Sequence, residues 1–372
     1  MNLTKTLPPH LKSQFVKVQK FLNNYTKRAY LVGGGVRDIL MGKSIKDLDI
    51  EVYDIDDILF DEIMNKLGSI GVGKSFFVYK FGDIDISLPR TEQKVGIGHK
   101  AFEVSICQDE KEASKRRDFT MNAMMLNIFD YKLLDFYGGA KSIERKTISL
   151  IDEVSFREDS LRVLRAVQFS ARFGFKIDKK TLEIMYILSL KDLSKTRIFW
   201  EFEKMFYASN LDFGLFYMYK LDLFEKIFIC EAKKTLFLKT ALELRRGVKR
   251  FKEDLKPYYF LYIVVNLLGL KMQNILKCID APRIYIRILK NQPFIQDSVS
   301  DKELKIIAID RPIKEWLGNY KKGIEKRAKE LGVWYNAYDG GVKVSDVIAD
   351  GFEKQEIKKE LRRRKIKCIN MY

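Results

Sequence analysis

The sequence predicts a mixed α/β part at the N-terminus, followed by a helical remainder. Up to about residue 144, short β-prone runs alternate with glycine-rich turns and short helices. From residue 160 to residue 209 the apolar residues recur at helical spacing, and helical segments rich in Leu, Ile, Phe and Tyr continue to about residue 330. With 372 residues, 47% of them hydrophobic, the chain can form several domains with sizeable cores.

The elements of the first part follow from apolar alternation and from the glycines that separate the runs. Strands are expected at 29–32, 46–53, 75–80, 83–88, 101–106, 122–129 and 132–136. Helices are expected at 9–24, 35–41, 56–67 and 109–117. Since no strand pattern follows residue 144, we expect the sheet to end there.

The charge of the chain favours a polyanionic partner. There are 68 Lys and Arg against 50 Asp and Glu, a net charge of +18, and nucleic acid is the usual partner of such a surplus. Residues 351–372 contain eight Lys and Arg against three Asp and Glu, and are expected to form a basic helix. The simpler alternatives are a generally Lys-rich proteome and a solvated helix face.

The composition argues against several other classes of protein. The cysteines are scattered and form no Cys-x-x-Cys pair, so neither a zinc site nor a disulfide framework is indicated; they are Cys107, Cys230, Cys278 and Cys368. The first residues lack the apolar core of a signal peptide, and the apolar run at 258–270 is too short to span a bilayer. A cytoplasmic protein without a membrane partner is therefore expected. With only two histidines, His10 and His99, the chain cannot build a histidine-rich metal phosphohydrolase domain, and a catalytic histidine network is not expected.

The most informative segment is residues 31–53, LVGGGVRDILMGKSIKDLDIEVY. Asp47 and Asp49 alternate with apolar residues and share one face of the expected strand, where two carboxylates can hold a divalent metal against a phosphate. The three preceding glycines let the backbone approach that phosphate closely. Asp83 or Asp85 is a candidate third carboxylate that takes a proton from an attacking hydroxyl. Taken alone, the Asp-x-Asp pair would be an acidic surface hairpin.

Two further motifs follow, KRRDFTMNAMML and REDSLRVLRAVQFSARFGF. In the first, Arg117 can clamp phosphates and Asp118 can accept from a ribose hydroxyl. In the second, Asp159, Arg162 and Arg165 share one helix face. An Asp acceptor beside an Arg donor complements the base edge of cytosine or adenine, which both carry an exocyclic amino group. The structural alternatives are an ion-paired helix end and an intrahelical ion-pair ladder.

These motifs, in this order, resemble those of the class II tRNA nucleotidyltransferases, the bacterial CCA-adding enzymes and their poly(A) polymerase relatives. The resemblance covers roughly the first half of the chain. The segment RTEQKVGIGHKAFEV resembles that family's flexible loop, and the C-terminal residues resemble its tRNA-binding end more weakly. The resemblance implies an α+β nucleotidyltransferase head with a small mixed sheet, followed by an all-helical neck, body and tail. The implied boundaries are 1–145, 146–210, 211–300 and 301–372.

The resemblance also implies roles for single residues. Asp47 and Asp49 would hold Mg²⁺ and be catalytic, and the nucleotide would be bound by Gly34, Arg37, Arg117, Asp118, Asp159, Arg162 and Arg165. Two departures from the family pattern are Ser160, where Pro is usual, and Thr196, where Glu is common. They bear on how two helices begin and are supported, and the residues that face the site are unaffected.

The implied activity is the template-independent addition of C, C and A to the 3′ end of tRNA from CTP and ATP, with release of pyrophosphate. Three alternatives stay open at this point. They are a partial enzyme that adds only CC or only A, a poly(A) polymerase, and a non-catalytic RNA-binding protein.

Overall fold

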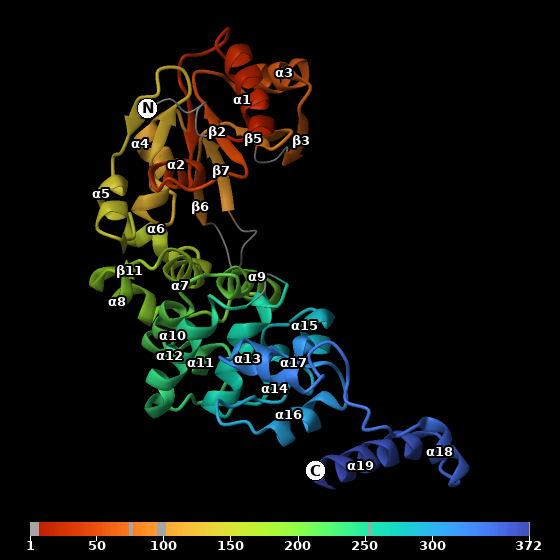
Figure 1. The fold of residues 1–372 in the computed structure, drawn as a ribbon. Coiled ribbons are helices and arrows are strands. Elements are labelled where there is room, and N and C mark those ends of the chain that lie inside the picture. The colour runs from red at the N-terminus through yellow and green to blue at the C-terminus, as the bar shows by residue number, and fades with distance from the viewer. Residues whose placement is uncertain (1–6, 74–76, 95–101, 252–253, 372) are drawn as a thin grey trace. The chain divides into compact units, whose positions relative to one another are not determined.

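The computed structural model describes residues 7–73, 77–94, 102–251 and 254–371. The chain divides into two compact units. The first comprises residues 1–201 and 220–222, and the second comprises residues 202–219 and 223–372. The units are described separately below, with the labels of Figure 1.

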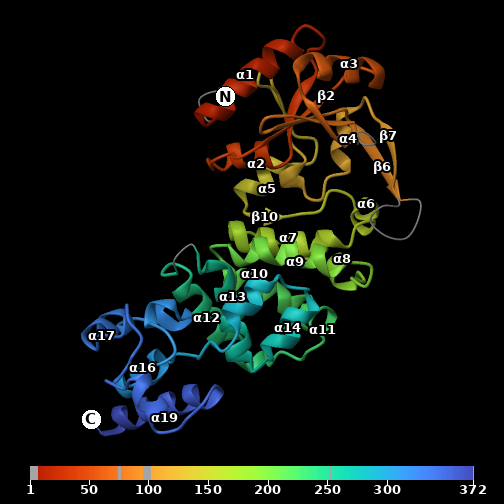
Figure 2. The ribbon, with the colours of Figure 1, turned by 90° about the vertical axis from the view of Figure 1, so that its right-hand side faces the viewer.

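The first unit contains a seven-stranded mixed sheet in the order β3-β4-β5-β2-β1-β8-β9. Its strands are β1 (Ala29–Val32), β2 (Leu48–Val52), β3 (Ile70–Gly73), β4 (Val78–Phe81), β5 (Ile84–Ser87), β8 (Met125–Asn127) and β9 (Leu133–Leu134). Only β2 and β5 run parallel in this sheet, with Asp49 opposite Asp85. Figure 2 shows a separate ribbon of β6 (Arg90–Lys94) and β7 (Phe102–Ile106).

Helices cover both faces of this sheet. On one face, α1 (Pro9–Leu22) and α3 (Asp57–Leu67) pack apolar side chains against those of β1, β2 and β5. On the other face, Ala113 of α4 (Glu110–Lys115) packs against Tyr30, Val32, Tyr53 and Met125. Side chains alternate along β2, so Asp49 and Glu51 lie on the α4 face of the sheet while Ile50 enters the main core.

The first unit has further helices between and after the strands of the sheet. They are α2 (Gly34–Leu40), η3 (Thr120–Asn122), α5 (Gly139–Glu144), α6 (Glu153–Arg157), α7 (Leu161–Phe173), α8 (Lys179–Ile187) and α9 (Lys195–Phe206), the last of which runs into the second unit. A short parallel pair, β10 (Thr147–Ile148) and β11 (Lys176–Ile177), lies among them. The predicted α/β first part with a helical remainder is thus confirmed, with this two-residue pair as an addition.

Several predicted strands are shorter than expected, for identifiable reasons. The strand predicted at 122–129 begins only at Met125, because Asn122 belongs to a 3₁₀ turn in which its side chain bonds Arg37 and Asp118. The strand predicted at 132–136 stops at Leu134, because Asp135 accepts the backbone N–H groups that open α5. The strand predicted at 75–80 starts at residue 78. Part of the predicted flexible loop, residues 95–101, lies outside the described residues.

The second unit contains helices joined by loops, with no strand among its described residues. Its elements are α10 (Leu211–Lys220), α11 (Leu223–Lys226), η4 (Lys234–Leu236), α12 (Phe237–Gly247), α13 (Lys256–Leu268), α14 (Met272–Cys278), α15 (Arg283–Leu289), α16 (Asp301–Ala308), η5 (Ile313–Glu315), η6 (Leu317–Tyr320), α17 (Ile324–Glu330), α18 (Val344–Ala349) and α19 (Gln355–Met371). Most side chains of α13 are buried, so this helix is central to the unit.

The C-terminal helix α19 is the expected basic helix. Its buried Glu360 accepts hydrogen bonds from Arg363 and Arg364 at 2.7–2.9 Å, which fixes two of its cations on one side. No helix within the described part of the chain has the length and apolar character needed to cross a membrane.

Candidate functional site

A cavity of about 480 Å³ in the first unit gathers nearly all of the predicted site residues. It is lined by Gly33, Gly34, Arg37, Asp49, Arg116, Arg117, Asp118, Asn122, Asp159, Leu161, Arg162, Arg165, Phe169, Arg172 and Arg197. Of the residues predicted to hold the metal or the nucleotide, Asp47 alone is not part of this lining, and it lies two positions before Asp49. The candidate third carboxylates, Asp83 and Asp85, are not part of the lining either. Residues more than a hundred positions apart in the sequence therefore share one cavity.

The turn between β1 and α2 needs glycine. Gly33 has a φ of +67°, and a Cβ at this position would lie 3.2 Å from Arg117 Nη1. A side chain here would be strained and would displace that guanidinium. Arg37, only 4% exposed, leaves this turn on α2 and donates to Asp38 and to Asn122 Oδ1 at 2.7 Å. The turn thus brings its backbone and Arg37 to the cavity wall, directly beside Arg117.

Carboxylates gather beside this turn. Asp49 on β2 is in register with Asp85 on β5, and in a parallel pair such neighbours lie about 4.8 Å apart on one face. Asp83 instead binds α1, where its backbone N–H donates to Gln14 and its carboxylate accepts from the same side chain. Of the two candidates for a third carboxylate, Asp85 is therefore the one beside Asp49.

The electrostatics of this carboxylate group fit a divalent cation. Burial in the cavity raises the pKa of the Asp49 carboxyl, and Asp47 and Asp85 raise it further, although Arg117 opposes them. Within the described residues, no three Asp, Glu, His or Cys side chains form a complete metal site. Mg²⁺ commonly uses only one or two carboxylates and completes its shell with water and substrate phosphates, so the donor set fits this ion.

Glu51 is the residue that the sequence analysis missed as an anchor. It is 2% exposed, and its Oε1 accepts from both Arg116 and Arg117 at 2.7 Å. Burial opposes ionisation of Glu51, but the two guanidinium groups outweigh it and hold the pKa below its usual range. Glu51 therefore fixes Arg117 in the cavity wall as a charged pair.

Asp118 links the sheet to α7. Its Oδ2 accepts from Arg165 Nε at 2.7 Å, and its Oδ1 accepts from Asn122 Nδ2 at 2.9 Å. Burial raises the pKa of Asp118, but Arg165 and Asn122 outweigh it and lower the pKa overall. The carboxylate is thus ionised and held in one orientation. Its donors among the described residues are Arg165, Asn122 and the backbone N–H of Phe119.

The remaining predicted residues lie at the start of α7. Arg162 donates to the backbone carbonyl oxygens of Ser155 and Arg116, at 2.9 and 2.7 Å, so its guanidinium is held from two sides. Asp159 forms an ion pair with Arg197 at 3.3 Å. Asp159 and Arg162 thus both line the cavity, each with partners of its own, and their role toward a base stays a prediction.

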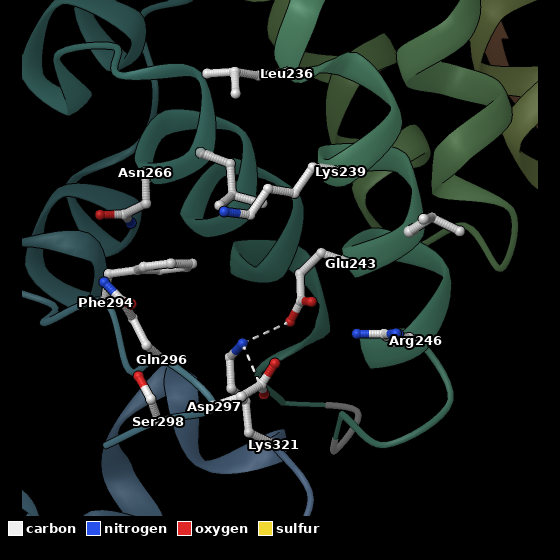
Figure 3. Close-up of a pocket in the computed structure, with 12 residues that line it drawn as sticks. Leu236, Lys239, Glu243, Arg246, Asn266, Phe294, Gln296, Asp297, Ser298 and Lys321 are labelled. Atoms are coloured by element: carbon white, nitrogen blue, oxygen red, sulfur yellow. Dashed lines mark hydrogen bonds and ion pairs between the residues drawn. The ribbon is translucent and has the colours of Figure 1, made fainter. Parts of the chain in front are cut away.

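A second cavity of about 570 Å³ lies in the helical unit (Figure 3). Buried Lys321 bridges Glu243 and Asp297 at 3.1 and 3.2 Å, so its single positive charge offsets part of the charge of the two carboxylates. Lys239 and Arg246, seven residues apart on α12, face the cavity, and neither has a hydrogen-bond or ion-pair partner among the described residues. The cavity therefore offers two available cations. Sequence analysis assigned it no function.

Two domain families match the chain. The poly A polymerase head domain matches residues 29–149, and a probable RNA and SrmB-binding site of polymerase A matches residues 174–232. Together with the relatives below, these matches confirm the resemblance that the sequence motifs indicated.

Similar proteins are CCA-adding enzymes. Those of Buchnera aphidicola subsp. Cinara cedri and Lactococcus lactis subsp. cremoris are 34% and 33% identical, over 64% and 55% of this chain. The chain spans 64% and 54% of their lengths, which is less than two thirds of either.

The fold matches solved structures. The CCA-adding enzyme of Thermotoga maritima complexed with tRNA has a TM-score of 0.69 at 20% identity, over 99% of this chain and 93% of that one. The Bacillus stearothermophilus enzyme in complex with CTP has a TM-score of 0.65 at 21% identity, over 98% and 94%.

Proposed function

We propose that this chain, which carries a poly A polymerase head domain at residues 29–149, is a tRNA nucleotidyltransferase that adds C, C and A to the 3′ end of tRNA. The observation that carries the proposal is that the residues of three separate motifs line one cavity, in a chain whose relatives are CCA-adding enzymes. Free thiols at all four cysteines suit the cytoplasm, where we expect the enzyme to work.

In the proposed reaction the 3′-hydroxyl of the tRNA attacks the α-phosphate of CTP or ATP, and pyrophosphate leaves. Arg37 and Arg117 would hold the phosphates beside the glycine turn, and Gly34 would let the backbone approach them. Asp118 would accept from the ribose, which requires it to share its carboxylate with Arg165. Asp85 is our candidate for taking the proton of the attacking hydroxyl.

Nucleotidyltransferases generally need a divalent metal, and we propose Mg²⁺ held by Asp47 and Asp49. Bound there, the ion would act as a Lewis acid on the phosphate oxygens and neutralise the developing charge. The raised pKa of Asp49 supports this choice, because a cation would relieve the repulsion from Asp47 and Asp85.

We propose that Asp159 and Arg162 select the base. Arg162→Ala should lower the preference for CTP and ATP over UTP and GTP at least about tenfold, since a lost pair of directed hydrogen bonds is worth ~1–3 kcal/mol. The measurement is kcat/KM for each nucleotide. Arg157→Ala, which removes an exposed arginine paired only with Glu153 among the described residues, is the control. Unchanged selectivity in Arg162→Ala would contradict the assignment.

We propose that the helical unit binds the tRNA backbone, in part through the Lys239 and Arg246 cavity. The double variant Lys239→Ala with Arg246→Ala should weaken tRNA binding and reduce the slope of log affinity against log salt by about 0.7–0.9 per lost phosphate contact. Filter binding at several salt concentrations would show this. The double variant Lys302→Ala with Lys322→Ala, which removes two exposed lysines outside the cavity lining, is the matched charge control. An unchanged slope in the double variant would argue against this contact.

The direct test of the proposed function uses a tRNA transcript that lacks its CCA end and each of the four labelled nucleotides. We expect incorporation of CTP first and of ATP only when CTP is also present. Incorporation of UTP or GTP at comparable rates, or of no nucleotide, would contradict the proposal. The alternatives of a partial enzyme or a poly(A) polymerase are not favoured, because the named relatives are CCA-adding enzymes.

A further inference from the structure

One arginine of the cavity, Arg172, lies within the third motif, but the sequence analysis gave it no role. Arg172 lies near the C-terminal end of α7 and lines the cavity. With Arg162, Arg165 and Phe169 it forms a stripe at i, i+3, i+7 and i+10, which places all four on one helix face. The stripe therefore extends the predicted set of cavity residues by two further turns of helix.

The hydrogen bonds of the cavity arginines set Arg172 apart. Each of the others contacts an oxygen of the protein: Arg37 bonds Asp38 and Asn122, Arg116 and Arg117 bond Glu51, Arg162 bonds two backbone carbonyls, Arg165 bonds Asp118 and Arg197 bonds Asp159. Arg172, in the part of the chain that the structure describes, has only the rings of Phe169 and Phe173, with its guanidinium carbon 5.8 and 5.1 Å from their centres. Its five N–H donors are available to a ligand.

The neighbours of Arg172 concentrate positive charge. Arg37 lies against the same two stacked rings, at 5.3 and 4.8 Å, and Lys43 lies 4.4 Å from the centre of Phe173. Burial lowers the pKa of Arg172 and the nearby Arg37 lowers it further, while the charges of Asp38 and Glu201 oppose this only in part. An anion with several oxygens would be attracted to this point.

The position of Arg172 along α7 indicates which part of a bound nucleotide it would contact. From Arg162 to Arg172 the helix rises about 15 Å, a length that an extended nucleoside triphosphate spans. With the base at Asp159 and Arg162 and the ribose beside Asp118 and Arg165, the far end of the stripe meets the terminal phosphates.

We infer that Arg172, together with Arg37, binds the β- and γ-phosphates of the incoming nucleoside triphosphate and hence the pyrophosphate that leaves. The inference rests on the proposed function and adds a residue to its site. Because CTP and ATP share these phosphates, Arg172 contributes equally to both. It contributes nothing to base selection.

The test is equilibrium binding of CTP, CDP and CMP to the full chain without tRNA. Arg172→Ala should weaken CTP binding about 10- to 100-fold, as expected for lost charge-assisted hydrogen bonds, and leave CMP within twofold. In turnover, KM should rise by the same factor for CTP and ATP, and inhibition by pyrophosphate should weaken. Arg172→Gln keeps part of the packing against the phenylalanines but removes the charge and three of the five N–H donors, so it replaces the alanine variant if that one does not fold. Arg145→Ala, an exposed arginine after α5, is the control.

The possible outcomes distinguish the inference about Arg172 from the proposed function. If the wild-type protein prefers CTP to CMP and the Arg172 variants keep that preference, the inference is wrong while the proposed function stands. Equal losses for CTP and CMP would also contradict it. If the wild-type protein neither binds nor incorporates nucleotides, the proposed function fails, and the inference fails with it.

Discussion

Asp49→Ala is expected to reduce nucleotide incorporation about a thousandfold or more, because it removes a proposed metal ligand that faces the phosphates and acts on the charge of the transition state. Asp47→Ala should behave in the same way. Binding of tRNA should change little, since neither carboxylate belongs to the cationic surfaces that would contact RNA. Single-turnover incorporation and filter binding measure the two quantities separately.

The control for this prediction is Asp83, which directly precedes β5. Asp83 is acidic, exposed and close in sequence to Asp85, but it is tied to Gln14 and not in register with Asp49. Asp83→Asn should leave incorporation intact, whereas Asp85→Asn should reduce it. Substantial incorporation by either Asp47→Ala or Asp49→Ala would contradict the metal assignment, and a larger loss in Asp83→Asn than in Asp85→Asn would reverse the choice of third carboxylate.

Glu51→Gln is expected to have the largest effect on stability. The substitution keeps the shape of the side chain but leaves Arg116 and Arg117 without the buried charge that both of them contact at 2.7 Å. Breaking a buried ion pair on one side costs about 3–5 kcal/mol in the free energy of unfolding. Urea denaturation at neutral pH would measure it. Glu153→Gln, which breaks an exposed pair with Arg157, should change stability by less than about 0.5 kcal/mol.

The buried contact of Glu51 with Arg116 and Arg117 should also make the stability of the protein depend on pH. The pKa of Glu51 is lower in the folded protein than its ordinary value of about 4.3, so its stabilisation is fully present above that value. It is lost as the pH falls through the folded pKa, when the carboxylate becomes protonated. The stability difference between wild type and Glu51→Gln should therefore be largest at neutral pH and shrink below about pH 4. A difference that is small at neutral pH, or that grows in acid, would show that Glu51 is not the anchor of the two arginines.

Much of the site could be predicted because its signals are local. The alternation that places Asp49 opposite Ile50 extends over only five residues of β2, and Arg162 and Arg165 are one helical turn apart. Residue type and spacing alone determine such features. The fold class follows from similar local patterns, since strand-like and helical periodicities change near residue 144.

Contacts between residues that lie far apart in the sequence could not be predicted. Glu51 shares its strand face with Asp49, but only the fold brings Arg116 and Arg117, 65 and 66 residues further on, to its carboxylate. That Arg172 bonds no oxygen among the described residues is likewise apparent only when the bonds of every other cavity arginine are known. The edge strand β3 was missed because two of its four residues are glycines, which carry no side-chain pattern.

We propose that the chain completes the CCA end of tRNA and then stops. The most direct test of this claim uses three tRNA transcripts, one ending before the CCA sequence, one after CC and one after CCA, each incubated with CTP, ATP and Mg²⁺ and sized on a gel. We predict that the first gains C, C and A, that the second gains a single A, and that the third is not extended. Addition of A alone to the second transcript with no C added to the first, or a long ladder of A on any of them, would contradict the claim.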